Sequence, residues 1–304
     1  MALARTDLVA PTASERVRAT AELLERRGYA LSAGRLGEIC LGGALGVHEV
    51  RRAVASSPDM VDIEGLVLSR RLAERAPAIA GRAARHGASA EVYTPVALEF
   101  IRRFVAAAPF VISVSIAGSL ASGGFDLADD VDLNLVVEDG YKHQAYVVLN
   151  VLGLLHALRY RGKPVDDLSR RPLAPRLMTA NLVTERSDWT PLARQDAGMA
   201  FELLVQEPVF GQDFLAGALA ANPALLELFP QLAGRRGRWA VTVDRRAPRW
   251  LYPRLLESPA RLLGERAWRY MMWTRRHRPD ALRRVELVRS TMRPYTLFDR
   301  GPAI

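Results

Sequence analysis

The chain has 304 residues, and its 49% hydrophobic and 25% charged content is that of an ordinary globular protein with room for two or three modest domains. The single cysteine, Cys40, excludes an intramolecular disulfide and a multi-cysteine metal site; its apolar neighbours predict a buried thiol, and a reducing cytoplasm is the expected location. No apolar run reaches the roughly 18 residues that a membrane-spanning helix needs, and the N-terminus lacks the apolar core expected of a secretory signal.

The net charge of +9 is concentrated toward the C-terminus. Residues 235–300 hold 18 arginines against six acidic residues, so this stretch carries more than the whole excess. Only Lys142 and Lys163 among the 42 basic residues are lysines, a bias that reflects genome composition as much as function. The placement of the arginines is therefore more informative than their number.

Residues 14–27, 33–40 and 47–55 are predicted helices, the second of them capped by Ser32. Residues 62–68 then predict a β-hairpin that turns at Glu64-Gly65. Three helices followed by a hairpin are the element order of a winged helix, and we assign residues 1–70 to such a domain. The hairpin is acidic, whereas phosphate contacts dominate nucleic-acid affinity. A packing or partner-docking role is therefore favoured, with DNA binding as the alternative.

Residues 71–108 predict a helical connector. It is Ala- and Arg-rich up to Ala90, and Pro95 is expected to begin a further helix because proline suits a first helical turn. A buried strand follows over 111–117, then a glycine turn with a short helix over 118–124, and a second strand over 130–137. These elements open an expected core over residues 109–190.

Two carboxylates are predicted to leave one face of that second strand. Side chains alternate across a strand, so Asp130 and Asp132 share a face and lie roughly 7 Å apart. Their repulsion calls for a cation, and Mg²⁺ takes one or two such oxygens together with waters and substrate phosphates. Gly118 lets the backbone approach a ligand closely, and the following amides with the Ser119 hydroxyl could bind a phosphate.

A Gly-Ser pair after one strand and an Asp-x-Asp on the next resembles the nucleotidyltransferase superfamily that includes DNA polymerase β. The resemblance implies metal-dependent transfer of a nucleotidyl group from a nucleoside triphosphate. Asp130 and Asp132 would be the catalytic residues that hold Mg²⁺ or Mn²⁺, and Gly118 and Ser119 would bind the triphosphate. The alternatives are a solvated strand edge and a plain turn. No GxGxxG or GxxxxGK[ST] motif supports a dinucleotide-binding or P-loop protein.

Residues 141–160 predict a long helix, and its His143 and His156 are too far apart in sequence for a metal pair, so each is expected to be a surface or hydrogen-bonded, partly buried histidine. The next strand is predicted over 177–184, with Leu177, Thr179, Asn181 and Val183 on one face and Met178, Ala180 and Leu182 on the other.

In the superfamily this strand usually carries a third carboxylate, but here its polar face offers Asn181. Asparagine can contact a substrate or a metal through its carbonyl but cannot act as a general base. Either another acid supplies the missing charge, or the acceptor is already anionic and needs no base, or the site is catalytically weak. The nearest acids in sequence are Asp166, Asp167 and Glu185.

A second resemblance, to a group of bacterial nucleotidyltransferase-like proteins, covers about residues 20–230. It rests on an Asn-centred strand, a helix, a Pro-x-x-Gly turn, a second helix and an Asn-Pro ending. The matching residues are Asn181, Pro208, Gly211, Asn222, Pro223 and Pro230. It implies an architecture but no substrate.

Residues 191–304 are predicted to be a C-terminal helical region with a basic tail. A helix that begins at Ser258-Pro259 mixes Leu, Trp and Met with arginines. Such a helix either packs on the sheet through its apolar side or meets an anionic membrane surface, RNA or an acidic partner.

The predicted fold is therefore α+β, with a nucleotidyltransferase-type mixed sheet, flanking helices, an N-terminal winged helix and a C-terminal helical region. The predicted activity is nucleotidyl transfer to an unidentified small-molecule acceptor. A nucleotide- or partner-binding module with the same fold and a nucleic-acid-binding regulator are the alternatives.

Overall fold

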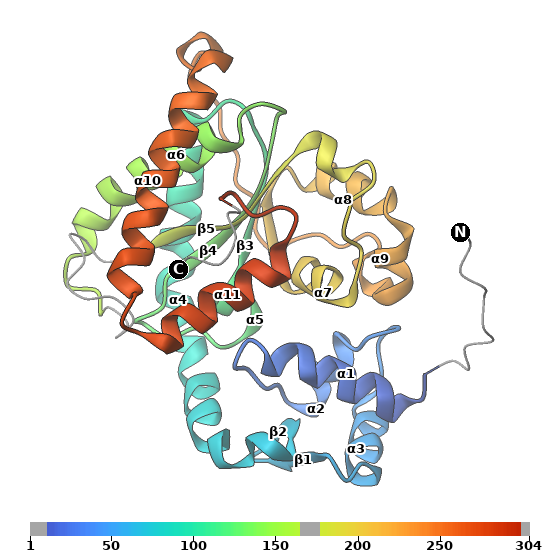
Figure 1. Cartoon of the computed structure of the whole chain (residues 1–304). Helices are drawn as coiled ribbons and strands as arrows, with labels where there is room; N and C mark the ends of the chain where they lie inside the picture. The colour runs from blue at the N-terminus through green and yellow to red at the C-terminus, as the bar shows by residue number, and fades with distance from the viewer. Residues whose placement is uncertain (1–10, 165–176, 299–304) are drawn as a thin grey trace.

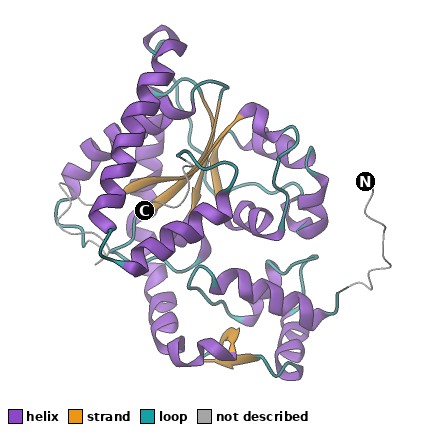
Figure 2. Cartoon of the chain, in the orientation of Figure 1, coloured by secondary structure: helices purple, strands orange, loops and turns teal. Residues whose placement is uncertain are grey.

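The computed structural model describes residues 11–164 and 177–298, which form a mixed sheet flanked by helices (Figures 1 and 2). Of these described residues, 58% are helical and 13% are in strands, so the predicted α+β class is confirmed. None of the described helices is long and apolar enough to cross a membrane.

The N-terminal unit contains α1 (Ala13–Glu25), α2 (Ala33–Glu38), α3 (Val47–Ser56) and the antiparallel pair β1 (Met60–Ile63) and β2 (Leu66–Ser69). The predicted helices and hairpin are therefore present. The Ser32 hydroxyl accepts a hydrogen bond from the Arg35 amide and caps α2, as predicted. Glu64 (φ +54°) and Gly65 (φ +78°) both adopt positive φ, the backbone of a two-residue turn that matches strand twist.

A short 3₁₀ helix, η1 (Arg70–Arg75), leads into α4 (Ala76–Ala107), which is one continuous helix of 32 residues. The prediction that Pro95 begins a new helix is wrong, since Pro95 lies inside α4. A proline there deprives the Glu91 carbonyl of its helical donor. Both residues are exposed, so water can replace that donor, while Phe100, Phe104 and their apolar neighbours hold the second half on the sheet.

The sheet has the order β5-β4-β3-β6. Its strands are β3 (Val111–Ala117), β4 (Val131–Val137), β5 (Met178–Glu185) and β6 (Glu207–Phe210). The β4–β5 pair is parallel, and the other two pairs are antiparallel. The one-turn helix α5 (Gly118–Ser122) links β3 to β4, and α6 (Lys142–Ala157), continued by η2 (Leu158–Tyr160), starts the crossover to β5. Sequence reasoning missed β6 because Pro208 and Gly211 resemble a turn, yet proline is tolerated on such an edge strand.

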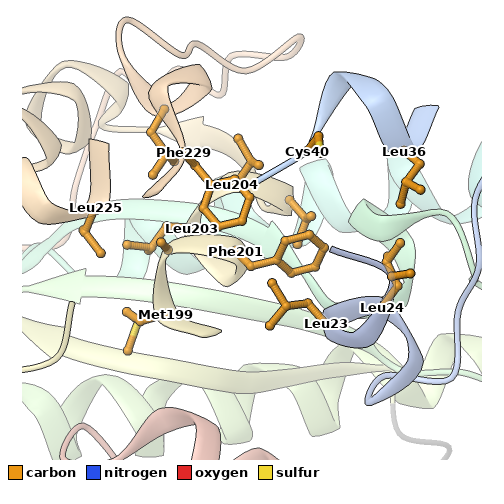
Figure 3. Packing of buried hydrophobic residues seen from close by; sticks show 14 of the residues in the cluster. Leu23, Leu24, Leu36, Cys40, Met199, Phe201, Leu203, Leu204, Leu225 and Phe229 are labelled. Carbon is orange, nitrogen blue, oxygen red and sulfur yellow. The ribbon is translucent and has the colours of Figure 1, made fainter. Parts of the chain in front are cut away.

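The two faces of the sheet pack against different layers. Leu133 and Leu135 of β4 belong to the core formed with α4 and α6. Val136 belongs to a second core, formed with α7 (Ala197–Val205), α8 (Gln212–Ala220), α9 (Pro223–Leu228) and the N-terminal unit. Figure 3 shows Leu23 and Leu24 close to Phe201. The N-terminal unit therefore shares a hydrophobic core with the C-terminal helices.

Cys40 lies in this second core and is fully buried, so the prediction of a structural thiol is confirmed, and burial raises its pKa. The remaining short 3₁₀ turns are η3 (Arg186–Trp189), η4 (Pro230–Leu232), η5 (Arg249–Leu251) and η6 (Arg254–Leu256). Two long helices finish the chain. α10 (Glu257–Arg275) packs along α6, and α11 (Pro279–Met292) contacts α7 (Figure 1).

Candidate functional site

The turn between β3 and α5 brings the Gly-Ser pair against the Asp-bearing strand. Gly118 has φ +61°, a conformation that L side chains rarely adopt. A Cβ atom at position 118 would lie 2.2 Å from Oδ2 of Asp132. Only glycine therefore lets the turn approach this carboxylate so closely. The predicted juxtaposition of Gly118 and Asp132 is present.

Asp132 occupies a defined place in the sheet, between Ala117 of β3 and Thr179 of β5. The Thr179 hydroxyl donates a hydrogen bond of 2.7 Å to Oδ1 of Asp132. Asp130 lies one residue before β4, and Val131 between the two aspartates is fully buried in the α4–α6 core. Ser119 is buried, and its hydroxyl makes no hydrogen bond within the described part of the chain.

The loop that leads from α5 to Asp130 is held by one face of α4. Arg82 donates hydrogen bonds to the Gly124 carbonyl and to Asp129, and Arg85 pairs with Asp126 at 2.8 Å. These contacts fix the start of β4, and with it the position of Asp130.

A histidine and a tyrosine complete this support. Nδ1 of His86 accepts a hydrogen bond of 3.1 Å from the Phe125 amide. Burial, and then the charge of Arg238, lower the pKa of His86, which keeps the ring neutral and able to accept. The Tyr29 ring from the N-terminal unit covers Gly124, where an added Cβ would lie 2.2 Å from Cδ1 of the ring.

Further along the same face, buried and partly buried polar side chains form a continuous network. Nδ2 of Asn181 donates to Oδ1 of Asn134 at 3.0 Å and to Oε1 of Glu202 at 2.9 Å. Nδ2 of Asn134 donates to Oε1 of Gln206 at 2.8 Å. Glu202 also pairs at 3.2 Å with Arg27, which lies two residues after the end of α1. The network thus joins β4 and β5 to α7 and to the N-terminal unit.

Sequence reasoning found Asn181 but missed its partners. The available signal was the pair Glu202 and Gln206, which lie four residues apart in the otherwise apolar stretch 197–205 and its cap. Polar residues at that spacing in an apolar helix share one side of it. Arg27, which lies 175 residues before Glu202 in the chain, gave no such signal.

The predicted faces are correct for residues 178–181 of β5. Leu177, just before the strand, packs in the α4–α6 core with Met178, so its predicted face is wrong. The register shifts after the Leu133–Ala180 pair, so that Asn134 pairs with Leu182. Leu182 consequently joins the α7 core and Val183 the α4–α6 core, the reverse of simple alternation. A bulge inserts one extra residue and reverses the faces beyond it.

The third carboxylate expected at a metal site is still missing. Glu185 accepts a hydrogen bond from the Gly140 amide at the far end of β5, roughly 20 Å along the strand from Thr179, so it does not complete the site. Asp166 and Asp167 lie outside the described residues. Within residues 11–164 and 177–298, no three His, Cys, Asp or Glu side chains form a group that could hold a metal ion. A cation here would rely on Asp130, Asp132, phosphate oxygens and water.

The two histidines of α6 have different surroundings. His143 contacts Glu257 at 2.8 Å. His156 is buried between the Phe100 and Tyr160 rings, and neither of its ring nitrogens has a hydrogen-bond partner in the described structure. The expectation of a surface or hydrogen-bonded histidine is therefore wrong for His156.

The residues behind the second resemblance have structural roles. Asn222 is fully buried, accepts from the Leu192 amide at 2.7 Å and donates to the Trp189 and Ala218 carbonyls. Gly211 has φ +63°, and a Cβ there would lie 1.9 Å from the Ile112 carbonyl oxygen. Pro208 lies in β6, while Pro223 and Pro230 begin α9 and η4.

A cavity of about 460 Å³ lies beside α5, between α4 and the end of β6. Its lining includes His86, Leu120, Glu207 and Trp239. Ile116, which forms its β3 wall, belongs to the α4–α6 core, whereas Asp132 belongs to the opposite face of the sheet.

No protein-family model matches the chain, and no curated protein or solved structure is significantly similar to it.

Proposed function

We propose that the chain is a metal-dependent nucleotidyltransferase that moves a nucleotidyl group from a nucleoside triphosphate to a small-molecule acceptor. The contact between Gly118 and Asp132 is the observation that carries this proposal. It brings backbone amides of a tight turn, which suit phosphate oxygens, next to a carboxylate, which suits a divalent cation. The arrangement is that expected for a polyphosphate bound together with its metal.

In this reaction an acceptor oxygen attacks the α-phosphorus, and pyrophosphate leaves with the electrons of the broken P–O bond. Asp130 and Asp132 would hold Mg²⁺, which supplies positive charge to the phosphate oxygens. The chain's own contribution is orientation. Thr179 fixes the Asp132 carboxylate, and the Ser119 hydroxyl and the turn amides would bind the β- and γ-phosphates.

The surroundings of Asn181 bear on the acceptor. Its amide donates hydrogen bonds to Asn134 and Glu202, and Glu202 is paired with Arg27. Neither Asn181 nor Glu202 is therefore arranged to take a proton from the acceptor. An acceptor whose attacking oxygen is already anionic, such as a phosphate ester, needs no base. We therefore assign this acceptor class to the site.

The N-terminal unit contributes packing to the site in this proposal. It retains the element order of a winged helix, but α1 faces α7 through the shared core, and Tyr29 covers the Asp-bearing loop. These contacts support the packing role over DNA binding.

The test is calorimetry of the full chain with each nucleoside triphosphate, with and without Mg²⁺, and then pyrophosphate release over a panel of phosphate esters, aminoglycosides and RNAs. Asp132→Asn should abolish metal-dependent binding. Asp59→Asn, which makes the same charge change in the exposed turn between α3 and β1, should leave it intact. Binding that ignores both Mg²⁺ and Asp132 contradicts the proposal.

A second candidate function is a nucleotide-binding module without transfer. The amide at Asn181 in place of a carboxylate favours it. Metal-dependent nucleotide binding with no pyrophosphate from any acceptor in the panel would select this function.

A further inference from the structure

Helix α10 has an inner face that packs on the body of the protein. At its middle, a Cβ added to Gly264 would lie 2.5 Å from Cζ of Phe298 and 3.3 Å from Cδ1 of Tyr146 on α6. Glu265 is buried next to this contact and pairs with Arg261 and Arg269. This face needs no further partner.

The outer face of α10 is apolar and open. Leu262 is 60% exposed, Leu263 55%, Tyr270 62% and Trp273 57%. At about 100° per residue these four side chains fall within a sector of about 100° on the side opposite Gly264. Tyr270 and Trp273 stack on each other with ring centroids 6.0 Å apart. Exposed apolar patches of this kind mark interaction surfaces.

The segment just before α10 extends the exposed apolar surface. Trp250 in η5 is 77% exposed, and Leu255 in η6 is 74% exposed. This segment forms the projecting tip above α10 in Figure 1. On the same side of the molecule, α6 packs against α10 and leaves Leu154 and Leu155 at least half exposed.

The segment that contains this face is strongly basic, and three of its arginines, Arg249, Arg261 and Arg269, pair with carboxylates. Residues 249–278 contain eight arginines and two glutamates. Both glutamates turn inward, since Glu257 accepts hydrogen bonds from the His143 and Gln144 amides and Glu265 is buried. Arg266 lies in the middle of the apolar sector and makes no hydrogen bond or ion pair with the described residues.

We propose that the outer face of α10, made of Leu262, Leu263, Arg266, Tyr270 and Trp273, docks the protein on an anionic membrane surface. Leucine and aromatic side chains would enter the boundary between headgroups and acyl chains, and the arginines would meet lipid phosphates. α10 would lie in the plane of the surface over its length of about 28 Å. A twofold interface between two copies centred on this face would instead bring two Arg266 side chains together, which disfavours self-association.

The experiment is co-sedimentation of the full chain with vesicles of phosphatidylcholine alone and of phosphatidylcholine with 30% phosphatidylglycerol, at about 0.1 and 0.5 M salt. We expect binding to the anionic vesicles that falls at least tenfold at high salt. Leu263→Ser/Trp273→Ser and Arg266→Glu should each weaken it by about tenfold or more. Circular dichroism confirms that each variant is folded.

Matched control variants come from elsewhere on the surface. Val47→Ser/Val92→Ser removes two exposed apolar side chains, and Arg52→Glu makes the same charge reversal on α3, so both should bind like the parent. Equal binding to neutral and anionic vesicles, or equal losses in control and α10 variants, would overturn the proposal. A dimer that dissociates only in Leu263→Ser/Trp273→Ser would also overturn it, by assigning the face to a second copy.

Discussion

Replacement of Gly118 by alanine is the sharpest perturbation of the site. The left-handed backbone at φ +61° costs an L residue about 1–2 kcal/mol. In addition, the new Cβ would lie 2.2 Å from Oδ2 of Asp132, so the carboxylate has to move. That movement breaks the Thr179 hydrogen bond, and a bond to a charged group contributes about 1.5–3 kcal/mol. Gly118→Ala should therefore lower the free energy of unfolding by about 2.5–5 kcal/mol.

A matched control separates the two causes. Gly234 has φ +66°, and an added Cβ there meets nothing within 4 Å, so Gly234→Ala should cost only about 1–2 kcal/mol. Urea unfolding followed by circular dichroism measures both variants. The double variant Gly118→Ala/Asp132→Ala should cost little more than Asp132→Ala beyond the backbone strain. Equal losses for Gly118→Ala and Gly234→Ala would refute the claim that the turn is fitted to the carboxylate.

Three further predictions concern buried or partly buried ionisable side chains. Glu202→Gln should lower the free energy of unfolding by about 2–4 kcal/mol, because it leaves the largely buried Arg27 guanidinium without its ion partner. Adding Arg27→Met to this variant should recover part of that loss, as measured by urea unfolding. A loss below about 1 kcal/mol would count against a stabilising pair. Burial acts to raise the pKa of Glu257, but hydrogen bonds from the His143 side chain and neighbouring amides outweigh it and lower the pKa below 4.5. The stabilisation by Glu257 is thus full above pH 4.5 and is lost as the pH falls through its lowered pKa. Parent and Glu257→Gln should therefore converge in stability as the pH falls below 4.5, and parallel pH profiles would exclude this role. Burial lowers the pKa of His156 below 6.5, so on acidification the unfolded chain binds a proton at this histidine before the folded chain does. Stability should therefore fall as the pH drops below 6.5. His156→Leu should remove this contribution from the dependence of Tm on pH, and an unchanged slope would contradict the prediction.

Most elements of the fold follow from local sequence. β3 spans the predicted residues, and the Glu64-Gly65 turn and the Ser32 cap are where the sequence places them. These features depend on residues that are neighbours in the chain. β6 and the continuity of α4 depend instead on tertiary packing, which overrides the local preferences of Pro208 and Pro95.

The site is predictable to a similar extent. The alternation of side chains along the strand and the glycine turn predicted that Gly118 and Asp132 lie close together, and the structure places them in contact. The faces of β5 beyond Asn181 were wrong because a bulge is not visible as a residue pattern. The Glu202–Arg27 pair joins residues 175 positions apart, and no local rule connects them.

That pair also changes how the N-terminal unit should be understood. A DNA-binding domain that only projects from the protein needs no buried ion pair where it meets the rest of the chain. Arg27, however, reaches from just beyond α1 to the buried carboxylate of Glu202 on α7. Through Glu202 and Asn181, Arg27 is three hydrogen bonds away from Asn134, which lies two residues beyond Asp132 on β4. A shift of α1 would leave the Glu202 carboxylate buried without its cation. The free-energy cost of an unpaired buried charge therefore holds the N-terminal unit in place. Loss of α1 packing should therefore disturb the Asp-bearing strand as well as the N-terminal unit, which makes the two regions one cooperative unit.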